Sequence, residues 1–475
     1  MRYMNTGMKG SMNVGPDDSM NAGMNNSINA GFDDSMNVSR NSSGNSSGNA
    51  SRNASIAVKQ NELDTLLLVT TLSLVLIGIF MVYSSTSVVA PSSRPVPMMG
   101  ESHAAVHLID LRYLKKHLIS VFLGLVLMMI TYRTSLDWLR KYAIPVGIFS
   151  VLLLLAVKIP HIGLTVNGAR RWIRIGFFTF QPSESMKLAM VLCMSMYLSG
   201  QKFRPDEFTS FLKPVVFMVM VQGILLLQPD FGSASIIGAI TFALLFINGV
   251  RLKYIFSVGL VMVPIIIKLV MEPYRLKRIL VFLHPWADER NSGFQLIQSF
   301  VALGNGGLNG VGLGKSTQKL FFLPESKTDF IFAIIGEETG FLGALFVILL
   351  FILFFVRGVA ITRKFKDGFF FNLSCGITLL IAMQAVINMA VVTGLVPTKG
   401  LPLPFISYGG SSMIVNLAEV GLLLNLAKRF EPCRQEEPAG VVFDDTVSND
   451  EPLAASHRAY ARRKLKVYDD GKREI

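Results

Sequence analysis

The chain has 475 residues, of which 51% are hydrophobic and only 16% are charged. Soluble domains carry about 25% charged residues, so this composition argues against a soluble protein and for one embedded in lipid. The formal net charge of +13 would suit nucleic acid, but most basic residues lie in short stretches between apolar runs, which argues against such a partner. The three cysteines have neither disulfide nor metal-ligand spacing and are expected to be free thiols.

The first 58 residues are of low complexity and rich in Asn, Ser, Gly and Met. A short pattern recurs in them every eight residues, at 11–13, 19–21, 27–29 and 35–37. This repeat is too short and too polar to build a core, so residues 1–58 are predicted to form a disordered cytoplasmic tail. The tail has no charged stretch followed by an early apolar core, so it is not expected to be a signal peptide.

Several of the apolar runs that follow reach the roughly 18–20 residues needed to cross about 30 Å of hydrocarbon as a helix. Ten spanning helices are predicted, at 63–84, 117–132, 142–158, 186–200, 213–228, 232–249, 254–271, 328–356, 369–394 and 409–427. The run at 328–356 is longer than a bilayer requires and is expected to tilt or to extend beyond it. The fold class predicted is an all-α polytopic membrane domain over residues 59–430.

The distribution of Lys and Arg predicts the orientation of this domain. Basic residues are dense in the short links 133–141, 201–212, 250–253 and 357–368. They are sparser in the long segments 85–116, 159–185 and 272–327. Positive charge favours the cytoplasmic side, so the short links and both termini are predicted to be cytoplasmic and the long segments external. The polar tail 431–475 carries a basic cluster, Arg458, Arg462, Arg463 and Lys464, that is expected to tether it to anionic lipid.

Several basic residues are nevertheless predicted to lie at the external membrane boundary. They are Arg170, Arg171, Arg174, Arg275, Lys277, Arg278 and Lys399. Their charge runs against the insertion bias, and Arg and Lys are suited to neutralising phosphate, so an anionic lipid substrate is a good candidate. The alternative is that each side chain only anchors the chain to lipid headgroups.

Polar residues inside the apolar runs are a second signal. They are Asp230, Glu337, Glu338, Gln384, Asn388, Asn416 and Glu419. An ionisable group at membrane depth costs at least about 2.5 kcal/mol, so a functional pairing is the default hypothesis for the acids. Gln384 and Asn388 are four residues apart and could instead join helices through hydrogen bonds.

The predicted external segment 272–327 is the third signal. It is rich in glycine between residues 304 and 314, which suits tight turns folded over a groove. Asp288, Glu325 and Asp329 are predicted external carboxylates beside the basic residues, and they suit general-base chemistry or cation binding. Each could equally be an ion-pair partner, and no metal site follows from their spacing. The residues alone therefore predict an external site for an anionic lipid, and both transport and catalysis fit.

Several longer motifs resemble the SEDS family (shape, elongation, division, sporulation). They are 167–173 (NGARRWI), 181–187 (QPSESMK), 228–232 (QPDFG), 293–299, 323–330, 336–338 (GEE) and 397–412 (PTKGLPLPFISYGGSS). The resemblance covers about 63–430. Residues 285–288 (PWAD) and 398–400 (TKG) are closer to the division branch of the family than to its elongation branch. His284 and Glu289 depart from the family pattern, in which Asp and Pro are common at these positions, but they leave Asp288 aligned.

The resemblance implies a peptidoglycan glycosyltransferase that polymerises lipid II into glycan strands at the division septum, with undecaprenyl pyrophosphate as the leaving group. It implies Asp288 as the base. It assigns a second group to substrate or pyrophosphate binding: Arg171, Arg174, Lys399, Glu184, Lys187 and Ser411. It assigns a third group of supporting polar residues: Asp230, Glu325, Asp329 and Glu338. No organic cofactor is expected, and a divalent cation, Mg or Mn, could assist without assigned ligands.

The resemblance also implies partners and a location. The partners expected are a septal class B penicillin-binding transpeptidase and other division proteins, in the cytoplasmic (inner) membrane. Three alternatives remain: a lipid II flippase, an elongation-type polymerase and a scaffold without catalysis. A flippase would be expected to show inverted repeats, and none is visible among the predicted helices. A scaffold would not need the external acids and arginines.

Overall fold

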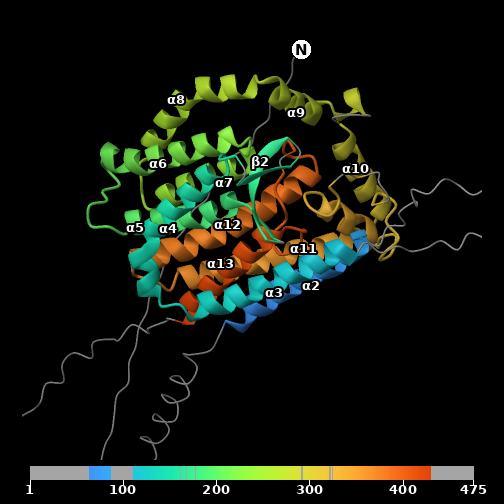
Figure 1. Ribbon diagram of the computed structural model, residues 1–475, viewed down its shortest axis with the longest axis horizontal. Helices are drawn as coiled ribbons and strands as arrows, with labels where there is room; N and C mark the ends of the chain where they lie inside the picture. The colour runs from blue at the N-terminus through green and yellow to red at the C-terminus, as the bar shows by residue number, and fades with distance from the viewer. Residues whose placement is uncertain are drawn as a thin grey trace, which may run out of the picture. The chain divides into compact units, whose positions relative to one another are not determined.

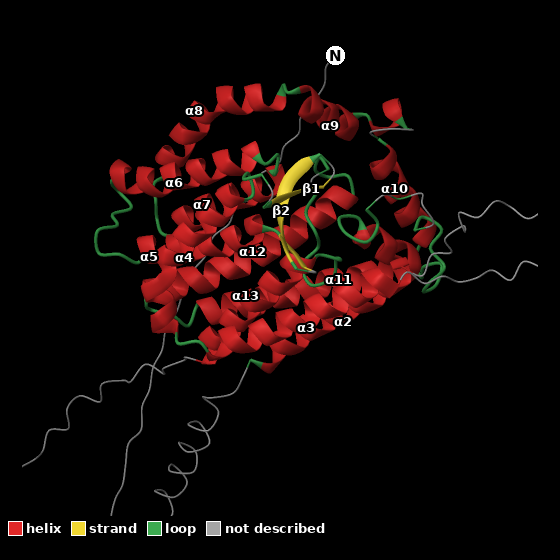
Figure 2. Ribbon diagram, in the orientation of Figure 1, coloured by secondary structure: helices red, strands yellow, loops and turns green. Residues whose placement is uncertain are grey.

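The computed structural model describes residues 64–86, 111–160, 162–166, 168–176, 178–289, 293–319, 323, 325–398 and 400–428. The tails 1–58 and 431–475 lie outside these ranges, and so does Lys399. The described residues form helices and one small sheet, shown in Figures 1 and 2.

Each of the ten predicted spans corresponds to one helix. These are α2 (Thr65–Thr86), α3 (Leu111–Arg133), α4 (Leu136–Ala156), α5 (Pro182–Leu198), α6 (Phe208–Leu227), α7 (Phe231–Ile247), α8 (Leu252–Val270), α11 (Ile331–Thr362), α12 (Gly368–Val392) and α13 (Gly410–Lys428). Within the described ranges, 7 helices are long and apolar enough to cross a membrane. The other three do not meet this criterion: α5 and α7 have 17 residues each, and the apolar stretch counted in α8 is Leu252–Pro264. The prediction of a polytopic helical membrane protein is confirmed.

Some predicted boundaries are wrong. The link 133–141 is almost entirely helical, because α4 begins at Leu136 and carries Arg140 and Lys141 in its first turns. Basic residues indicate where a chain leaves the hydrocarbon region, but a helix can continue past that level with its charges in water.

The long span predicted at 328–356 is interrupted. Gly340 in α11 has φ 70° and ψ −167°, which divides the helix into the halves 331–339 and 341–362. Glycine adopts this conformation because it has no Cβ to clash with the backbone. The break does not test whether this long span tilts or extends beyond the bilayer, which stays a prediction.

Two predicted external segments contain regular structure. Segment 159–185 forms an antiparallel sheet of β1 (Gly163–Val166), β2 (Ala169–Ile175) and β3 (Phe178–Phe180), in that order. Segment 272–327 contains α9 (Pro273–Leu283), the 3₁₀-helix η2 (Pro285–Asp288) and α10 (Phe294–Gly306). The all-α prediction thus needs one correction, because the chain also contains this small sheet. The sheet is drawn in yellow in Figure 2.

The sheet, α9, α10 and the connection 393–409 are joined at one end of the spanning helices. Ser411 at the start of α13 donates to the carbonyl of Thr179 in β3, and Arg278 of α9 donates to the carbonyl of Thr398. We call this end, which the sequence predicts to face outside, the external end. The opposite end carries the short links.

Helix α13 is the most enclosed of the spanning helices. It packs against α3 most extensively and also contacts α5 and α12. The contact with α3 is close because Gly421 has no side chain: a Cβ there would lie 2.3 Å from the carbonyl oxygen of Met128. In contrast, α8 exposes Phe256, Leu260 and Val261 on its surface, as expected for a helix that faces lipid.

Candidate functional site

Two arginines at the external end are held by backbone carbonyls. Arg171 of β2 donates from Nε to Gln228 O at 3.0 Å and from Nη2 to Pro229 O at 2.6 Å. Arg278 of α9 donates from Nη1 to Thr398 O at 2.9 Å. A carbonyl orients a guanidinium but carries no net charge of its own.

The turn that receives Arg171 is itself tightly fixed. Gln228 donates from Nε2 to Leu154 O at 2.7 Å. Asp230 is the N-cap of α7 and accepts from the backbone N–H of Ser233 at 3.1 Å. Asp230, predicted as a supporting polar residue, therefore orders the turn rather than facing an open site.

Asp329 interacts electrostatically with both arginines. Its backbone carbonyl and that of Leu401 both accept from Asn388 Nδ2, at 2.8 and 2.7 Å, which fixes the start of α11 against the 397–412 motif. Its carboxylate faces Gly400, where a Cβ would lie 3.1 Å from Oδ2. A side chain at position 400 would therefore crowd the carboxylate.

Burial, and after it the neighbouring charge of Glu325, raise the pKa of Asp329 to about 7. Arg278 and Arg171 oppose this shift. The structure thus brings two predicted acids and two predicted arginines into one electrostatic group. Glu325 itself is exposed and accepts from Thr328 Oγ1 at 2.9 Å.

Asp288 is the last residue of η2, between α9 and α10. Its carboxylate Oδ2 lies 3.6 Å from Lys277 Nζ, and 33% of its side chain is exposed. Its backbone carbonyl accepts from the N–H of Gly293 at 3.0 Å. Asp288 is therefore a fixed, accessible carboxylate in η2, which directly follows the helix α9 that carries Arg278. This geometry suits a general base.

Glu184 and Lys187 are found elsewhere. They form an ion pair of 2.8 Å on α5, and both side chains are almost completely buried. Lys187 Nζ also donates to Gln384 Oε1 of α12 at 3.2 Å. The pair lies inside the helix bundle and not among the external arginines, so its part in substrate binding stays a prediction.

Ser411 and Arg174 have different surroundings. The buried Ser411 Oγ accepts from the backbone N–H of Gln181 at 2.9 Å and donates to Thr179 O at 3.1 Å, so it joins α13 to the sheet. Arg174 is exposed on β2, where it pairs in register with Thr179. Arg174 can therefore meet a ligand from solution, whereas Ser411 has its hydrogen bonds satisfied within the protein.

A sequence model of the cell cycle protein family that comprises FtsW, RodA and SpoVE matches residues 64–431. The chain belongs to this family. Among its relatives, the probable peptidoglycan glycosyltransferase FtsW of Geobacter metallireducens is 42% identical over 370 residues, covering 78% of this chain and 95% of the relative. Stage V sporulation protein E of Bacillus subtilis is 37% identical over 372 residues, covering 78% of this chain and 98% of the relative.

Solved structures of the family have the same fold. A chain from a peptidoglycan synthase complex that coordinates polymerization and crosslinking matches with a TM-score of 0.62 at 29% identity, covering 77% of this chain and 98% of its own. The rod shape determining protein RodA of Thermus thermophilus matches with a TM-score of 0.56 at 25% identity, covering 78% and 98%. The resemblance inferred from the motifs is confirmed.

The family motif at 336–338 has partners that sequence reasoning missed. Glu338 forms a buried ion pair of 2.9 Å with Lys319 and accepts from Ser84 Oγ at 2.6 Å. The signal in the sequence was Lys319, the second of two lysines between a glycine-rich stretch and an apolar run. Nothing in the spacing linked it to Ser84, which lies more than 200 residues earlier.

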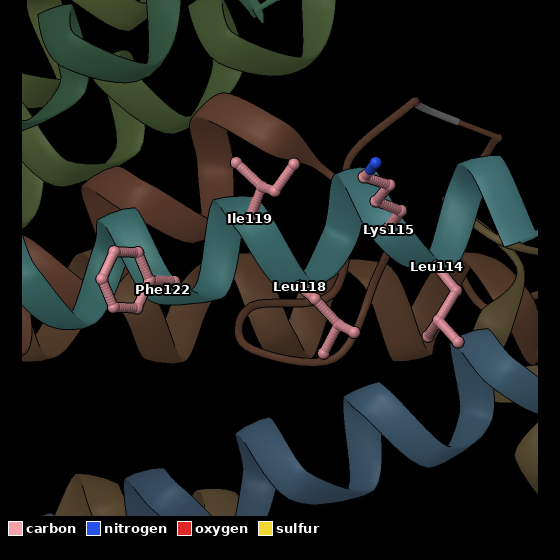
Figure 3. A pocket seen from close by; sticks show the side chains of 5 residues that line it. All are labelled: Leu114, Lys115, Leu118, Ile119 and Phe122. Carbon is pink, nitrogen blue, oxygen red and sulfur yellow. The ribbon is translucent and has the colours of Figure 1, made fainter.

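A pocket of about 480 Å³ lies away from all these residues, on α3. Figure 3 shows its lining side chains, Leu114, Lys115, Leu118, Ile119 and Phe122. The lining is apolar except for one lysine, and none of its residues belongs to the predicted site. A surface of this kind on a spanning helix suits lipid chains.

Proposed function

We propose that this family member is a peptidoglycan glycosyltransferase that polymerises lipid II, with Asp288 as its base. The observation that carries the proposal is the position of Asp288. Its accessible carboxylate pairs with Lys277. The same helix, α9, carries Arg278, whose guanidinium donates to the carbonyl of Thr398. The names of the relatives support the reaction class.

In this reaction the sugar hydroxyl of the acceptor attacks the anomeric carbon of the lipid-linked donor. Asp288 takes the hydroxyl proton as the new carbon–oxygen bond forms. The bond from the anomeric carbon to the pyrophosphate oxygen breaks, and the electron pair leaves with the lipid pyrophosphate. Arg171 and Arg278, with Arg174 and Lys399, stabilise the charge that develops on this leaving group.

Two carboxylates at the external end could hold a divalent cation. No group of three or more His, Cys, Asp and Glu residues suited to a metal occurs in the described part of the chain. Glu325 and Asp329 provide two carboxylates, and Mg²⁺ typically binds through one or two carboxylates together with water and substrate phosphates. When bound, such a cation would supply further charge neutralisation at the pyrophosphate.

The partner we propose is a class B penicillin-binding transpeptidase, together with other division proteins at the septum of the inner membrane. The structural relative from a synthase complex supports this proposal, since that complex coordinates polymerization with crosslinking. The FtsW names of relatives at about 40% identity favour division over elongation.

The test is a polymerisation assay on the purified full chain with its transpeptidase and fluorescent lipid II, read as glycan chains on a gel. The same protein in vesicles is tested for lipid II translocation. Glycan formation without translocation is expected. Translocation without glycan would support the flippase alternative and overturn the proposal.

A further inference from the structure

The break in α11 leaves four backbone groups without helical partners. In an unbroken helix the carbonyls of Glu337 and Glu338 would accept from the N–H groups of Phe341 and Leu342. The loop after α10 replaces these bonds. Val311 and Gly312 donate to Glu337 O and Glu338 O at 3.0 Å each, and Gly307 O and Leu308 O accept from Phe341 and Leu342 at 2.9 and 3.2 Å.

Only glycine allows the loop to approach α11 this closely. A Cβ on Gly310 would lie 2.2 Å from Glu338 O, and one on Gly306 would lie 2.0 Å from Gly336 O. A Cβ on Gly340 would lie 2.3 Å from the Gly310 nitrogen. The loop 307–314 is therefore inserted into the break, main chain against main chain.

Side chains then lock the end of this loop. Glu337 accepts from the backbone N–H and Oγ1 of Thr317, at 3.2 and 3.1 Å, and from Ser316 Oγ. Lys319 pairs with Glu338 at 2.9 Å and donates to Ser84 Oγ of α2 at 3.2 Å. The side chains of Lys319 and Glu338 are only 3% and 0% exposed, so neither is available to a soluble ligand.

The same loop is the continuation of α10, and the start of α10 is joined to Asp288. Gly293, immediately before α10, donates to Asp288 O, and a Cβ on Gly293 would lie 2.1 Å from Pro285 O. Along its length α10 packs on α11, and Figure 1 shows these two helices next to each other. A displacement at one end of this short helix is therefore transmitted to the other.

We propose that Lys319, Glu338 and Ser84 form a positioning site for Asp288: by holding the loop in the break of α11, they fix the place of α10 and so of the carboxylate. This proposal rests on the proposed function only for the role of Asp288. The three residues do not touch the reacting groups.

The test combines a distance measurement with kinetics on the full-length chain. Spin labels are placed at the exposed positions 289 and 393 by Glu289→Cys and Thr393→Cys in a background without native cysteines. The variants Glu338→Gln, Lys319→Met and Ser84→Ala are compared, with the charge-swapped pair Lys319→Glu and Glu338→Lys as the rescue. Arg251→Met, which breaks an exposed ion pair with Asp206 at the other end, is the matched control.

The parent is expected to give one narrow distance distribution. Glu338→Gln and Lys319→Met are expected to broaden it and to lower kcat for lipid II about 100-fold with little change in KM, because a misplacement of about 1 Å costs a factor of this size. The charge-swapped pair should recover part of the narrow distance distribution and part of kcat. The control Arg251→Met should change neither the distribution nor kcat.

An unchanged distribution in Glu338→Gln and Lys319→Met overturns the proposal, whether or not kcat falls. If either charge variant does not fold, Ser84→Ala replaces it, because this change removes only one hydroxyl. A Ser84→Ala variant with the narrow distance distribution and the kcat of the parent also overturns the proposal. The distance measurement needs no activity. A parent that is well ordered but makes no glycan therefore counts against the proposed function and leaves the positioning result standing.

Discussion

The two ends of the spanning helices hold their basic residues in different ways. At the external end, Arg171 and Arg278 are fixed by backbone carbonyls. At the other end, Arg251 pairs with Asp206 at 2.7 Å and Arg140 pairs with Asp367 at 3.2 Å, all four on the surface. A carboxylate cancels the charge of an arginine, whereas a carbonyl only orients it. The external arginines are therefore oriented by the backbone and interact electrostatically with the buried Asp329, whereas the arginines at the other end pair directly with surface carboxylates.

The largest effect is expected at Asp288, the external carboxylate that pairs with Lys277. Asp288→Asn keeps the size of the side chain and removes its basicity. A positioned base contributes about 10²–10⁴-fold in rate, so glycan formation should fall by that factor while insertion and transpeptidase binding are retained. The measurement is the initial rate of lipid II polymerisation.

Asp206→Asn is the control for this change, since Asp206 is also a surface carboxylate in an ion pair, but at the other end. It should leave the rate unchanged. Glu325→Gln should reduce activity less than Asp288→Asn. A near-parental rate in Asp288→Asn would mean that Asp288 is not the base.

The next largest effect is expected for Arg171→Ala. It removes a cation and its hydrogen bonds to the carbonyls of Gln228 and Pro229. A hydrogen bond to a charged group contributes about 1.5–3 kcal/mol, or roughly 10- to 100-fold in rate. Lys399→Ala should behave similarly. Arg251→Ala, at the other end, and Arg94→Ala, in the Pro- and Ser-rich part of the predicted external segment 85–116, should have little effect. Steady-state kinetics with lipid II measures all four, and equal losses would show that only the total charge matters.

The comparison also predicts a pH effect. The folded-state pKa of Asp329, about 7, lies above its ordinary value of 3.8, because burial and Glu325 disfavour its charge. The folded chain therefore holds more protons than the unfolded chain in this window, and the free energy of unfolding falls as pH rises from about 4 to 7. Above pH 7 the ionised Asp329 competes with the substrate for Arg171 and Arg278, so KM for lipid II should rise.

Asp329→Asn tests this directly, since it cannot ionise. Its KM for lipid II should stay level between pH 6 and pH 8.5. Its free energy of unfolding should fall less than that of the parent between pH 4 and pH 7. Thermal unfolding in detergent and KM across pH are the measurements. A parallel rise of KM in the variant and the parent would assign the pH effect to another group.

A smaller effect is expected at the end opposite the external end. Asp367 pairs with Arg140 and also accepts from the N–H of Phe369 at 2.8 Å as the N-cap of α12. Arg140→Ala should cost about 0–1 kcal/mol because the pair is exposed. Asp367→Ala should cost about 1 kcal/mol more because it also removes the cap. Denaturant unfolding in detergent would distinguish the two, and equal losses would mean that the cap contributes nothing.

The smallest effect is expected from the N-terminal tail. Deletion of residues 1–55 should leave insertion and polymerisation nearly intact, because this stretch has too few apolar residues to pack. The measurement is the polymerisation rate of the truncated, inserted chain beside the full chain. A clear loss of rate would give the tail a role in activity.

The sequence by itself determined the membrane class, the ten helices and the family. Apolar runs report the length of a bilayer crossing directly, and this information is local to each run. The sequence also predicted the external arginines as a group, with carboxylates beside them, since the positive charge contradicts the insertion bias of the segments that carry it. Asp329 and Arg278 are accordingly found in one electrostatic group in the structure.

Only the tertiary structure decided which partner each of these residues has. The halves of α11 could not be predicted, because the break at Gly340 is stabilised by main-chain bonds to a loop some 30 residues away in the chain. Lys319 and Glu338 are paired with Ser84 through a contact that spans more than 200 residues. Glu184 and Lys187 form an ion pair with each other inside the bundle, a pairing that only the tertiary structure shows. Residue type and spacing define what a side chain can bind, but the packing of distant helices determines what it meets.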